Sequence, residues 1–254
     1  MNDVLTLTGM VLVAAPAGEY DKRLVILTKE RGKITAFARG ARRPNSALLA
    51  AASPFAFGKF GVFPGRDTYR LVSAEIQNYF RELSLDVTGV YYGFYFLETA
   101  DYQIRENMDG SQMLKLLYAS LLALEKPSLP RKLVRAVFEL KSMVLNGEYP
   151  EVFQCACCGK KGELFGYVPE QNGLVCKDCA RGRRHVLRAE ASAVYALQFI
   201  VATPIEKLYT FTVSPQVLEQ ISGILDSFRK KWTDHEFKSL EILESLCSQG
   251  FPGI

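Results

Sequence analysis

The first 80 residues place apolar residues at alternate positions, with β-branched and aromatic side chains recurring at every second place. This pattern predicts short strands separated by turn-forming pairs such as Arg31-Gly32 and Pro64-Gly65. The expected strands are Leu5 to Val13, Leu24 to Thr28, Ile34 to Ala38, Phe55 to Phe63 and Tyr69 to Phe80. Five strands in this length are typical of a small barrel; an OB-fold fits best, and an SH3-like barrel stays open.

After Leu83 the apolar positions recur every three or four residues, which is the spacing of one helix face. Pro130 at a first-turn position begins one helix and Asn146-Gly147 ends it, and Ser214-Pro215 is an N-cap and first-turn pair for another. The expected helices cover 84–105, 111–125, 130–146, 189–202, 215–231 and 234–248. The predicted fold class is therefore α+β, with an OB-fold domain over 1–80 and a helical domain over 81–254, interrupted by a cysteine-bearing insertion at about 150–188.

Charge is distributed unevenly along the 254 residues. The whole chain has 31 Lys and Arg against 27 Asp and Glu, and this formal charge of +4 does not identify a nucleic-acid partner by itself. Residues 1–80 hold 11 basic and 6 acidic side chains, net +5, while residues 81–254 hold 20 and 21, net −1. Because a phosphate backbone responds to the local field, the barrel is the candidate nucleic-acid module. A solvated basic sheet surface is the alternative interpretation.

Composition and hydropathy exclude two broad classes of protein. With 48% hydrophobic residues and a mean hydropathy of +0.03, the sequence fits neither a wholly disordered chain nor a polytopic membrane protein. The longest uncharged stretches have 15 residues, as from Val4 to Gly18, whereas a spanning helix needs about 20 apolar ones. Asp3 precedes that stretch and no basic residue occurs before Lys22, so a secretory signal is not expected either. We therefore expect a cytoplasmic protein with reduced cysteines.

Clustered cysteines predict a metal site. Five of the six cysteines fall within residues 155–179, and four of them form two C-x-x-C pairs with 17 residues between the pairs. Such spacing is typical of a two-knuckle zinc site, in which tight turns bring four thiolates to one ion at about 2.3 Å. Gly159 permits the left-handed backbone of a knuckle, which favours Cys158 over Cys157 as a ligand. The expected ligands of one Zn²⁺ are Cys155, Cys158, Cys176 and Cys179.

Four thiolates leave no open position on the metal, so we expect this zinc to stabilise the insertion rather than to catalyse a reaction. The loaded site carries −2. The plainer interpretation of the basic residues around it is that they offset this charge, and the alternative is a second nucleic-acid contact. Cys157 is then a spare thiol, and His185 is expected at the surface or beside the ligands. A thioredoxin-like redox pair would need a βαβ context that the sequence does not show.

Motifs of catalysis are absent from the sequence. The strings G-x-x-x-x-G-K-[ST], G-x-G-x-x-G and G-x-S-x-G do not occur. His185 and His235 are the two histidines, and neither has a motif partner among Ser, Cys or carboxylate residues. We therefore expect a binding protein rather than an enzyme.

Three arginines in five residues follow the third expected strand, and further cations lie on neighbouring strands or loops. Such cations track phosphates, while Phe37, Phe57 or Tyr69 are candidates to stack on bases. Aromatics at alternate strand positions fit a barrel core equally well. The candidate DNA-binding residues are Lys33, Arg39, Arg42, Arg43, Lys59, Arg66 and Arg70.

These motifs in this order resemble the bacterial RecO family of recombination mediators, over essentially the whole chain. The four cysteines stand where zinc-binding members have theirs, although some relatives lack them, and Phe237-Lys238-Ser239-Leu240 resembles the family's terminal helix. Asn45 departs from the pattern, because a basic residue is common there. The matching amino-terminal residues are Thr28, Glu30, Gly32, Lys33, Arg39, Gly40, Ala41, Arg42, Arg43, Ser46, Pro54 and Phe55.

The resemblance implies an OB-fold followed by a helical domain with an inserted zinc finger. It also implies binding of single- and double-stranded DNA, annealing of complementary strands and a complex with RecR. It further implies remodelling of single-stranded-DNA-binding protein (SSB) through its C-terminal tail so that RecA loads, a functional link to RecF, and a cytoplasmic, nucleoid-associated location. Without the resemblance, the same residues fit an RNA- or ribosome-binding protein with an OB-fold and a zinc ribbon.

Overall fold

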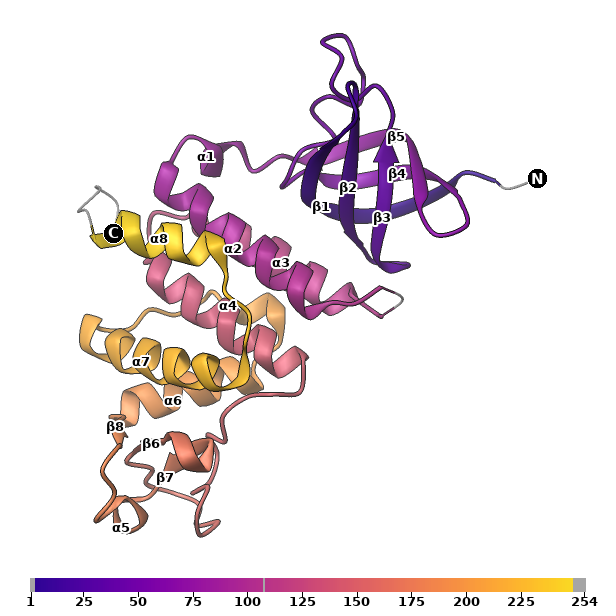
Figure 1. Cartoon of the computed structure of the whole chain (residues 1–254). Helices are drawn as coiled ribbons and strands as arrows, with labels where there is room; N and C mark the ends of the chain where they lie inside the picture. The colour runs from indigo at the N-terminus through magenta and orange to yellow at the C-terminus, as the bar shows by residue number, and fades with distance from the viewer. Residues whose placement is uncertain (1–2, 107, 249–254) are drawn as a thin grey trace. The chain divides into compact units, whose positions relative to one another are not determined.

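The structure is a computed structural model that describes residues 3–106 and 108–248 (Figure 1). It contains two compact units. Unit 1 runs to Glu125 and resumes at Phe237, and unit 2 is Lys126–Glu236. The domain boundary predicted at residue 80 coincides with the change from strands to helices. The two compact units instead divide the chain after Glu125 and after Glu236. No helix of the described residues is long and apolar enough to span a membrane.

Unit 1 contains a closed five-stranded barrel. Each strand pair is antiparallel except β3 with β5, which is parallel, and the pairing of β1 with β4 closes the barrel. This strand order, β1-β2-β3-β5-β4, is that of an OB-fold, so the first interpretation is confirmed over the SH3-like barrel. The strands are β1 (Leu5–Ala17), β2 (Asp21–Thr28), β3 (Gly32–Ala38), β4 (Phe57–Pro64) and β5 (Tyr69–Asn78).

The barrel interior follows from the alternation in the sequence. On β3 every second residue is fully or nearly fully buried, as Ile34, Ala36 and Ala38 are, and the residues between them face outwards. The fourth strand begins later than predicted, at Phe57. Phe55 instead adopts a left-handed backbone with φ 70° and packs its ring against Phe94, 4.9 Å between centroids.

Among the described residues, four helices complete unit 1, and one of them follows Phe237 near the end of the chain. Tyr118 of α3 packs on Phe57 of the barrel with ring centroids 4.5 Å apart. Buried Phe237 makes an edge-to-face contact with Tyr95 of α2 at 5.5 Å, and it leads directly into α8. Glu98 of α2 accepts hydrogen bonds from the first two backbone N–H groups of α8. The helices are α1 (Arg81–Ser84), α2 (Val87–Gln103), α3 (Ser111–Leu124) and α8 (Lys238–Ser248).

Unit 2 has a helical core with the cysteine-bearing module inserted in it. Ser214 caps α7 as predicted, because its side chain accepts a hydrogen bond from the Val217 N–H. Pro130 is the N-cap residue of α4 rather than its first helical residue, and Gly147 ends that helix with φ 80°. The helices are α4 (Arg131–Leu145), α6 (Ala191–Ala202) and α7 (Pro215–Trp232), with a 3₁₀ turn η2 (Ile205–Lys207).

The inserted module is a small sheet with one short helix. Strand β6 pairs antiparallel with both β7 and β8, and its three residues are buried. Asn172 turns the chain from β6 to β7 with a left-handed backbone, φ 52°. The elements are β6 (Gly166–Val168), η1 (Pro169–Gln171), β7 (Gly173–Val175), α5 (Lys177–Ala180) and β8 (Leu187–Arg188).

Candidate metal centre and nucleic-acid interface

Two backbone turns present the cysteine pairs of the module. In the first, the Gly159 N–H donates to the Cys155 carbonyl oxygen at 2.8 Å, and Gly159 has φ 70°, as the sequence predicts. In the second, Cys176 is the N-cap residue of α5, and the Ala180 N–H donates to its carbonyl oxygen at 3.0 Å. The Ala156 N–H donates to Leu174 of β7, so the sheet holds the first turn in place.

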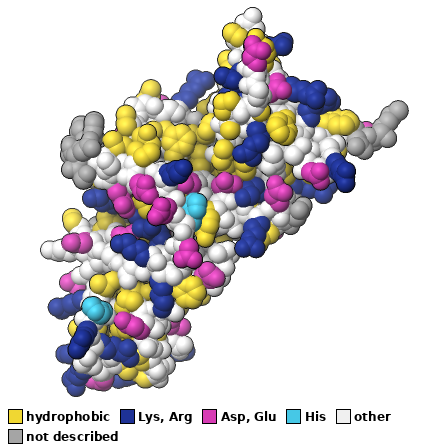
Figure 2. All heavy atoms as spheres, in the orientation of Figure 1, with side chains coloured by type: hydrophobic (Ala, Val, Ile, Leu, Met, Phe, Trp, Pro, Cys, Tyr) yellow, Lys and Arg dark blue, Asp and Glu magenta, His cyan; other side chains and the backbone are white. Residues whose placement is uncertain are grey.

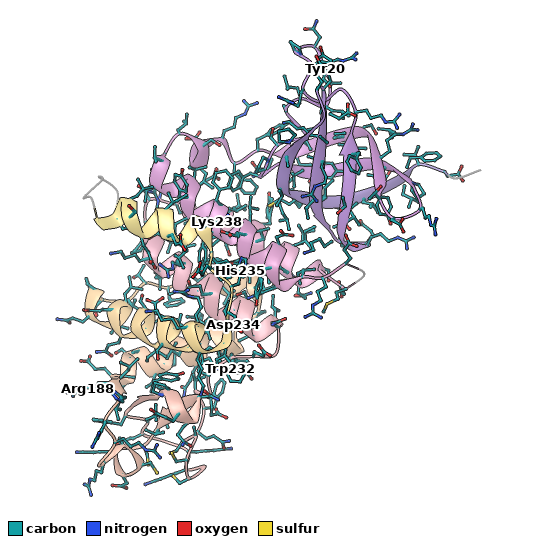
Figure 3. The ribbon with its side chains drawn as sticks, in the orientation of Figure 1. Tyr20, Arg188, Trp232, Asp234, His235 and Lys238 are labelled. Atoms are coloured by element: carbon teal, nitrogen blue, oxygen red, sulfur yellow. The ribbon has the colours of Figure 1, made fainter. Side chains whose placement is uncertain are left out.

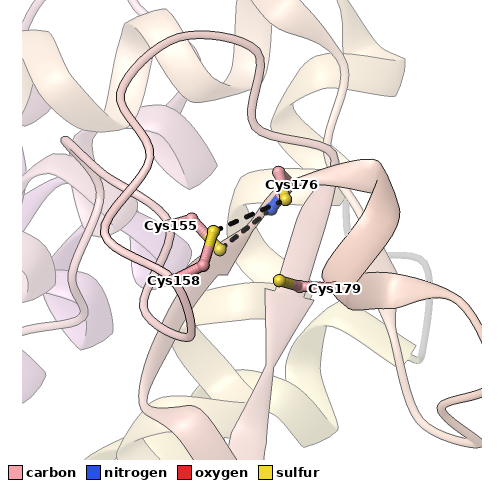
Figure 4. Close-up of side chains that lie close together, drawn as sticks. All are labelled: Cys155, Cys158, Cys176 and Cys179. Carbon is pink, nitrogen blue, oxygen red and sulfur yellow. Dashed lines mark hydrogen bonds between the residues drawn. The ribbon is translucent and has the colours of Figure 1, made fainter.

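The four predicted sulfurs converge (Figure 4). All Sγ atoms of the group lie within 4.8 Å of one another, and those of Cys158 and Cys176 are 4.0 Å apart. A tetrahedron with metal–sulfur bonds of about 2.3 Å has edges of about 3.8 Å, so these thiols need only a small contraction to surround one ion. The group consists of Cys155, Cys158, Cys176 and Cys179, and it could hold a metal ion.

The four thiols of this group differ in pKa. Burial opposes ionisation of Cys155, but hydrogen bonds from three backbone N–H groups outweigh it and lower the pKa of this thiol to about 6. Hydrogen bonds to the sulfurs of Cys158 and Cys176 raise the pKa of Cys179. Cys155 therefore ionises readily, whereas Cys179 retains its proton. A divalent cation bound among the four soft sulfur donors would stabilise all of them as thiolates, so these residues fit a metal of the zinc class.

The neighbouring Cys157 is not part of this group. Its side chain is exposed, and the Arg183 guanidinium donates to its sulfur at 3.1 Å. The same guanidinium donates to the Cys179 carbonyl oxygen at 2.8 Å, so it lies across the outside of the centre. His185 is exposed.

On the barrel, a hollow of about 430 Å³ brings aromatic and basic side chains together. Arg70 on β5 lies directly opposite Phe37 on β3 and Phe63 on β4, so these three side chains share one face. That face is the outer one, because the β3 neighbours of Phe37 are buried inside the barrel. The lining consists of Asp21, Phe37, Arg39, Phe63, Pro64, Gly65, Thr68, Tyr69 and Arg70.

Two of the seven candidate DNA-binding residues, Arg39 and Arg70, line this hollow, and both are exposed. The guanidinium of Arg70 lies 5.3 Å from the ring centre of Phe63, which keeps it over an aromatic face. The Gly40 N–H, next to Arg39, donates to the Asp21 carboxylate at 2.8 Å, and this bond fixes the backbone at the edge of the hollow.

Three other candidate DNA-binding residues contact groups of the protein outside the hollow. Lys33 donates to the backbone and side-chain oxygens of Asp101 on α2, with an ion-pair distance of 3.0 Å. The Arg42 guanidinium donates to the carbonyl oxygens of Gly18 and Glu19 at 3.1 and 3.0 Å.

Arg43 is the third of these candidates, and it lies 5.0 Å from the ring centre of Tyr20 at the tip of the β1–β2 turn (Figure 3). Lys59 and Arg66 are exposed and lie outside the residues that line the hollow.

The three aromatic candidates for base stacking lie in different surroundings. Phe37 and Tyr69 line the hollow, whereas Phe57 packs on Tyr118 of α3. Sequence reasoning missed Phe63, although it stands four residues after exposed Lys59 on β4 and therefore on the same, outer side of the strand. The alternation of side chains along β4 is the signal that could have found it.

Comparison with known proteins places both parts of the chain in one family. The sequence profile described as "Recombination protein O N terminal" matches residues 1–80, and that described as "Recombination protein O C terminal" matches residues 84–241. The chain is 30% identical over 240 residues to "DNA repair protein RecO" of Alkaliphilus metalliredigens, covering 94% of this chain and 98% of that one. It is 29% identical to the protein of that name in Acetivibrio thermocellus, covering 97% and 98%.

Proposed function

The chain belongs to the recombination protein O (RecO) family, and we propose that it is a non-enzymatic DNA-binding mediator of recombinational DNA repair. In this proposal it binds single- and double-stranded DNA, anneals complementary strands, and works with RecR to load RecA on SSB-coated single strands, in functional connection with RecF. A cytoplasmic, nucleoid-associated location follows from that role. The relatives' names and the shared length of the chains support the repair role.

The observation that carries the proposal is the hollow on the barrel. Its rings, Phe37, Phe63 and Tyr69, offer faces on which bases stack, and its two guanidinium groups offer charge-assisted bonds to phosphates. Stacking does not depend on base identity, so this combination suits single strands of any sequence. The local net charge of +5 over residues 1–80 raises the concentration of DNA near this face.

The salt dependence of DNA binding tests whether the hollow is the DNA-binding site. If four to six phosphates are neutralised, log affinity for single strands falls against log salt with a slope of about −3 to −4. Replacing Arg39 and Arg70 together by alanine should make this slope shallower by about 1.4, because two contacts of about 0.7 each are lost. Phe37→Ala should weaken binding by about 1–3 kcal/mol with the slope unchanged, because stacking carries no charge. Fluorescence anisotropy at several salt concentrations measures both quantities.

A matched control comes from the other end of the barrel. Lys29 and Arg31 are exposed in the β2–β3 turn, outside the lining of the hollow. The variant Lys29→Ala/Arg31→Ala loses the same charge and should keep most of the slope. An equal loss of slope in both double variants would mean that the barrel attracts DNA without a defined site.

RNA binding is separated from DNA binding by direct competition. Single-stranded DNA and RNA of equal sequence compete for the protein, and only RNA offers a 2′-hydroxyl. We expect DNA to displace RNA at equal or lower concentration. A consistent preference for RNA would replace the repair role by the RNA- or ribosome-binding alternative.

The metal in this proposal is one structural Zn²⁺, held by the four clustered thiolates. The ion would supply a charge that stabilises all four thiolates at once, and the cysteine turns would orient them. Metal analysis of the variants Cys155→Ser and Cys176→Ser checks the assignment, with Cys157→Ser as the control. We expect about one zinc per chain in the control and a large loss in the other two. Full retention of zinc in either ligand variant would contradict the ligand set.

For the SSB tail, which is acidic and ends in apolar residues, the proposed binding site is a hollow of about 740 Å³ in unit 2. Tyr195, Phe199 and Phe211 supply apolar faces, and Phe199 and Phe211 meet edge to face at 5.0 Å. Helix α6 begins at the hollow with Ala191, and Ser214 caps α7 there. The lining contains no acidic side chain, and the N-terminus of α7 complements a terminal carboxylate, whereas the N-cap residue of α6 is Glu190.

Peptide binding tests this site. Tyr195 is 69% exposed, so Tyr195→Ala leaves the fold intact and should weaken binding of a tail peptide about tenfold. A peptide with an amidated C-terminus should bind the unaltered protein less tightly, because it lacks the charge that the N-terminus of α7 attracts. Unchanged affinity in both experiments would place the tail elsewhere on the protein.

A further inference from the structure

Basic residues flank the cysteine group along the sequence. Lys160 follows Cys158 by two residues, and Lys177 follows Cys176 directly. Since the four sulfurs lie within 4.8 Å of one another, segments far apart in sequence bring these side chains around one centre. Figure 2 shows Lys and Arg side chains gathered over the part of unit 2 that Figure 1 labels β6, β7 and α5. We call five of them the knuckle surface: Lys160, Lys161, Lys177, Arg181 and Arg184.

The knuckle surface is available to an external anion. All five of its side chains are exposed. The ion pair found among them in the described residues joins Arg181 to Asp178 at 3.8 Å, with both side chains about three-quarters exposed, at 74% and 73%. Solvent screens such a pair to little net energy, so it does not neutralise the surface.

Arg183 is a cation that the fold holds beside the centre. Its guanidinium contacts the Cys157 sulfur and the Cys179 carbonyl oxygen, and its single charge offsets half of the −2 of a zinc-loaded centre. The backbone N–H of Cys176 also donates to the Cys155 sulfur at 3.4 Å. The centre therefore has hydrogen-bonding partners of its own, whereas the side chains of the five exposed cations make no hydrogen bond to its sulfurs in the part of the chain that the structure describes.

Aromatic side chains accompany the cations. Phe153 is 44% exposed and precedes Cys155 by two residues, and its backbone N–H is held by the Glu151 carboxylate at 2.8 Å. Arg188 (Figure 3) lies 5.9 Å from the ring centre of Phe165. An exposed ring such as that of Phe153 beside flexible cations suits unstacked bases on a phosphate backbone, and neither a duplex nor an acidic peptide offers such bases.

We propose that the knuckle surface, with Phe153 beside it, is a second binding site for single-stranded DNA, separate from the hollow on the barrel. The inference rests on the proposed DNA-binding function and extends it. One chain then holds two strands, one on each unit, and complementary strands meet on one protein molecule. Holding both strands raises their effective concentration, which is what annealing requires.

Stoichiometry with the full-length, zinc-loaded protein tests the second site. The probe is a fluorescent oligo-dT of about eight nucleotides, short enough to occupy one site at a time. We expect two oligonucleotides per chain for the unaltered protein and one for the knuckle variant, which also anneals complementary strands more slowly. The knuckle variant is Lys160→Glu, Lys161→Glu, Lys177→Glu and Arg184→Glu.

A control variant with the same change of charge separates a site from bulk attraction. It reverses four exposed lysines of unit 2 outside the module, and it should retain two oligonucleotides per chain. Zinc content equal to that of the unaltered protein shows that the knuckle variant is folded. The control variant is Lys126→Glu, Lys132→Glu, Lys207→Glu and Lys230→Glu.

Other stoichiometries contradict either the second site or the proposed function. The proposal is overturned by two oligonucleotides on the knuckle variant, or by equal losses in the knuckle and control variants. One oligonucleotide on the unaltered protein, lost in Arg39→Ala/Arg70→Ala, overturns the second site but leaves the proposed function standing. No oligonucleotide on the unaltered protein overturns the proposed function itself. Phe153→Ala should weaken the second site with its salt slope unchanged, and full affinity in this variant would remove stacking from the proposal.

Discussion

At the scale of single residues, Lys141 of α4 shows how unit 2 uses a buried cation. Its ammonium donates to the carbonyl oxygens of Ile200, Val201 and Thr203 at 3.3, 3.0 and 2.7 Å. These groups are at the C-terminal end of α6, where the helix has no partners of its own for its carbonyls. A positive charge there also complements the helix dipole. Burial lowers the pKa of Lys141 from its ordinary value.

Lys141→Met should reduce the free energy of unfolding of unit 2 by about 1–3 kcal/mol, because it leaves buried acceptors unpaired. The loss should grow as the pH rises towards 10. With a pKa lower in the folded than in the unfolded state, the unfolded chain binds more protons in that window, so the unaltered protein gains stability and the variant does not. Trp232, the single tryptophan, lies on α7 and reports unfolding of this unit by fluorescence.

The exposed neighbour Lys132 on the same helix serves as the control for this experiment. Lys132→Met should change stability by less than about 0.5 kcal/mol. Equal stability of the Lys141 and Lys132 variants at neutral pH would show that the carbonyl oxygens find other partners.

At the scale of elements, two paired glycines permit closure of the barrel. Gly9 on β1 lies opposite Gly58 on β4, and a Cβ atom on either would collide with a backbone carbonyl oxygen, of Leu27 and Glu75 respectively. Close approach of neighbouring strands at this point leaves no room for any side chain.

Gly58→Ala should therefore destabilise the barrel by about 1–3 kcal/mol, because the strands must separate to admit the methyl group. Hydrogen exchange of β4 and β5 amides measures this change. Gly223→Ala on α7 is the matched substitution, since its added Cβ meets no atom within 4 Å and alanine favours helix. Unchanged protection of β4 in the Gly58 variant would contradict the close approach.

Elements differ in how well local sequence predicts them. Ser214 and Gly147 act as the predicted N-cap and helix stop, because capping depends on a side chain and backbone only a few residues apart. Phe57 and Phe63 stand at alternate positions that share one side of β4, yet Phe63 lines the hollow and Phe57 packs on Tyr118 of α3. Alternation within one strand gives the side on which a residue stands, but not what covers that side.

At the scale of the whole molecule, the chain leaves unit 1 after Glu125 and returns to it at Phe237. All four clustered cysteines belong to unit 2, while α8 belongs to unit 1. The predicted helical domain 81–254 is thus shared between two compact units, each with a core of its own.

Removal of metal should affect the two units differently. Binding of zinc to four-thiolate sites contributes about 10 kcal/mol or more, so chelation should expose the β6 and β7 amides to exchange. The amides of the barrel should keep their protection, because no cysteine of the group lies in unit 1. Hydrogen exchange with and without chelator measures both. Loss of protection in the barrel as well would mean that the two units unfold as one.

The sequence by itself determined the five barrel strands, the main helices, the four-cysteine group and the family resemblance, because each depends on periodicity or spacing along the chain, and the strand order then decided between an OB-fold and an SH3-like barrel. Tertiary structure decided which cations are available. Lys33 and Arg42 look like Arg39 and Arg70 in the sequence, yet Lys33 pairs with Asp101 on a distant helix and Arg42 holds a turn. Whether a cation meets solvent or a partner depends on residues far away in the chain, and only the folded molecule brings them together.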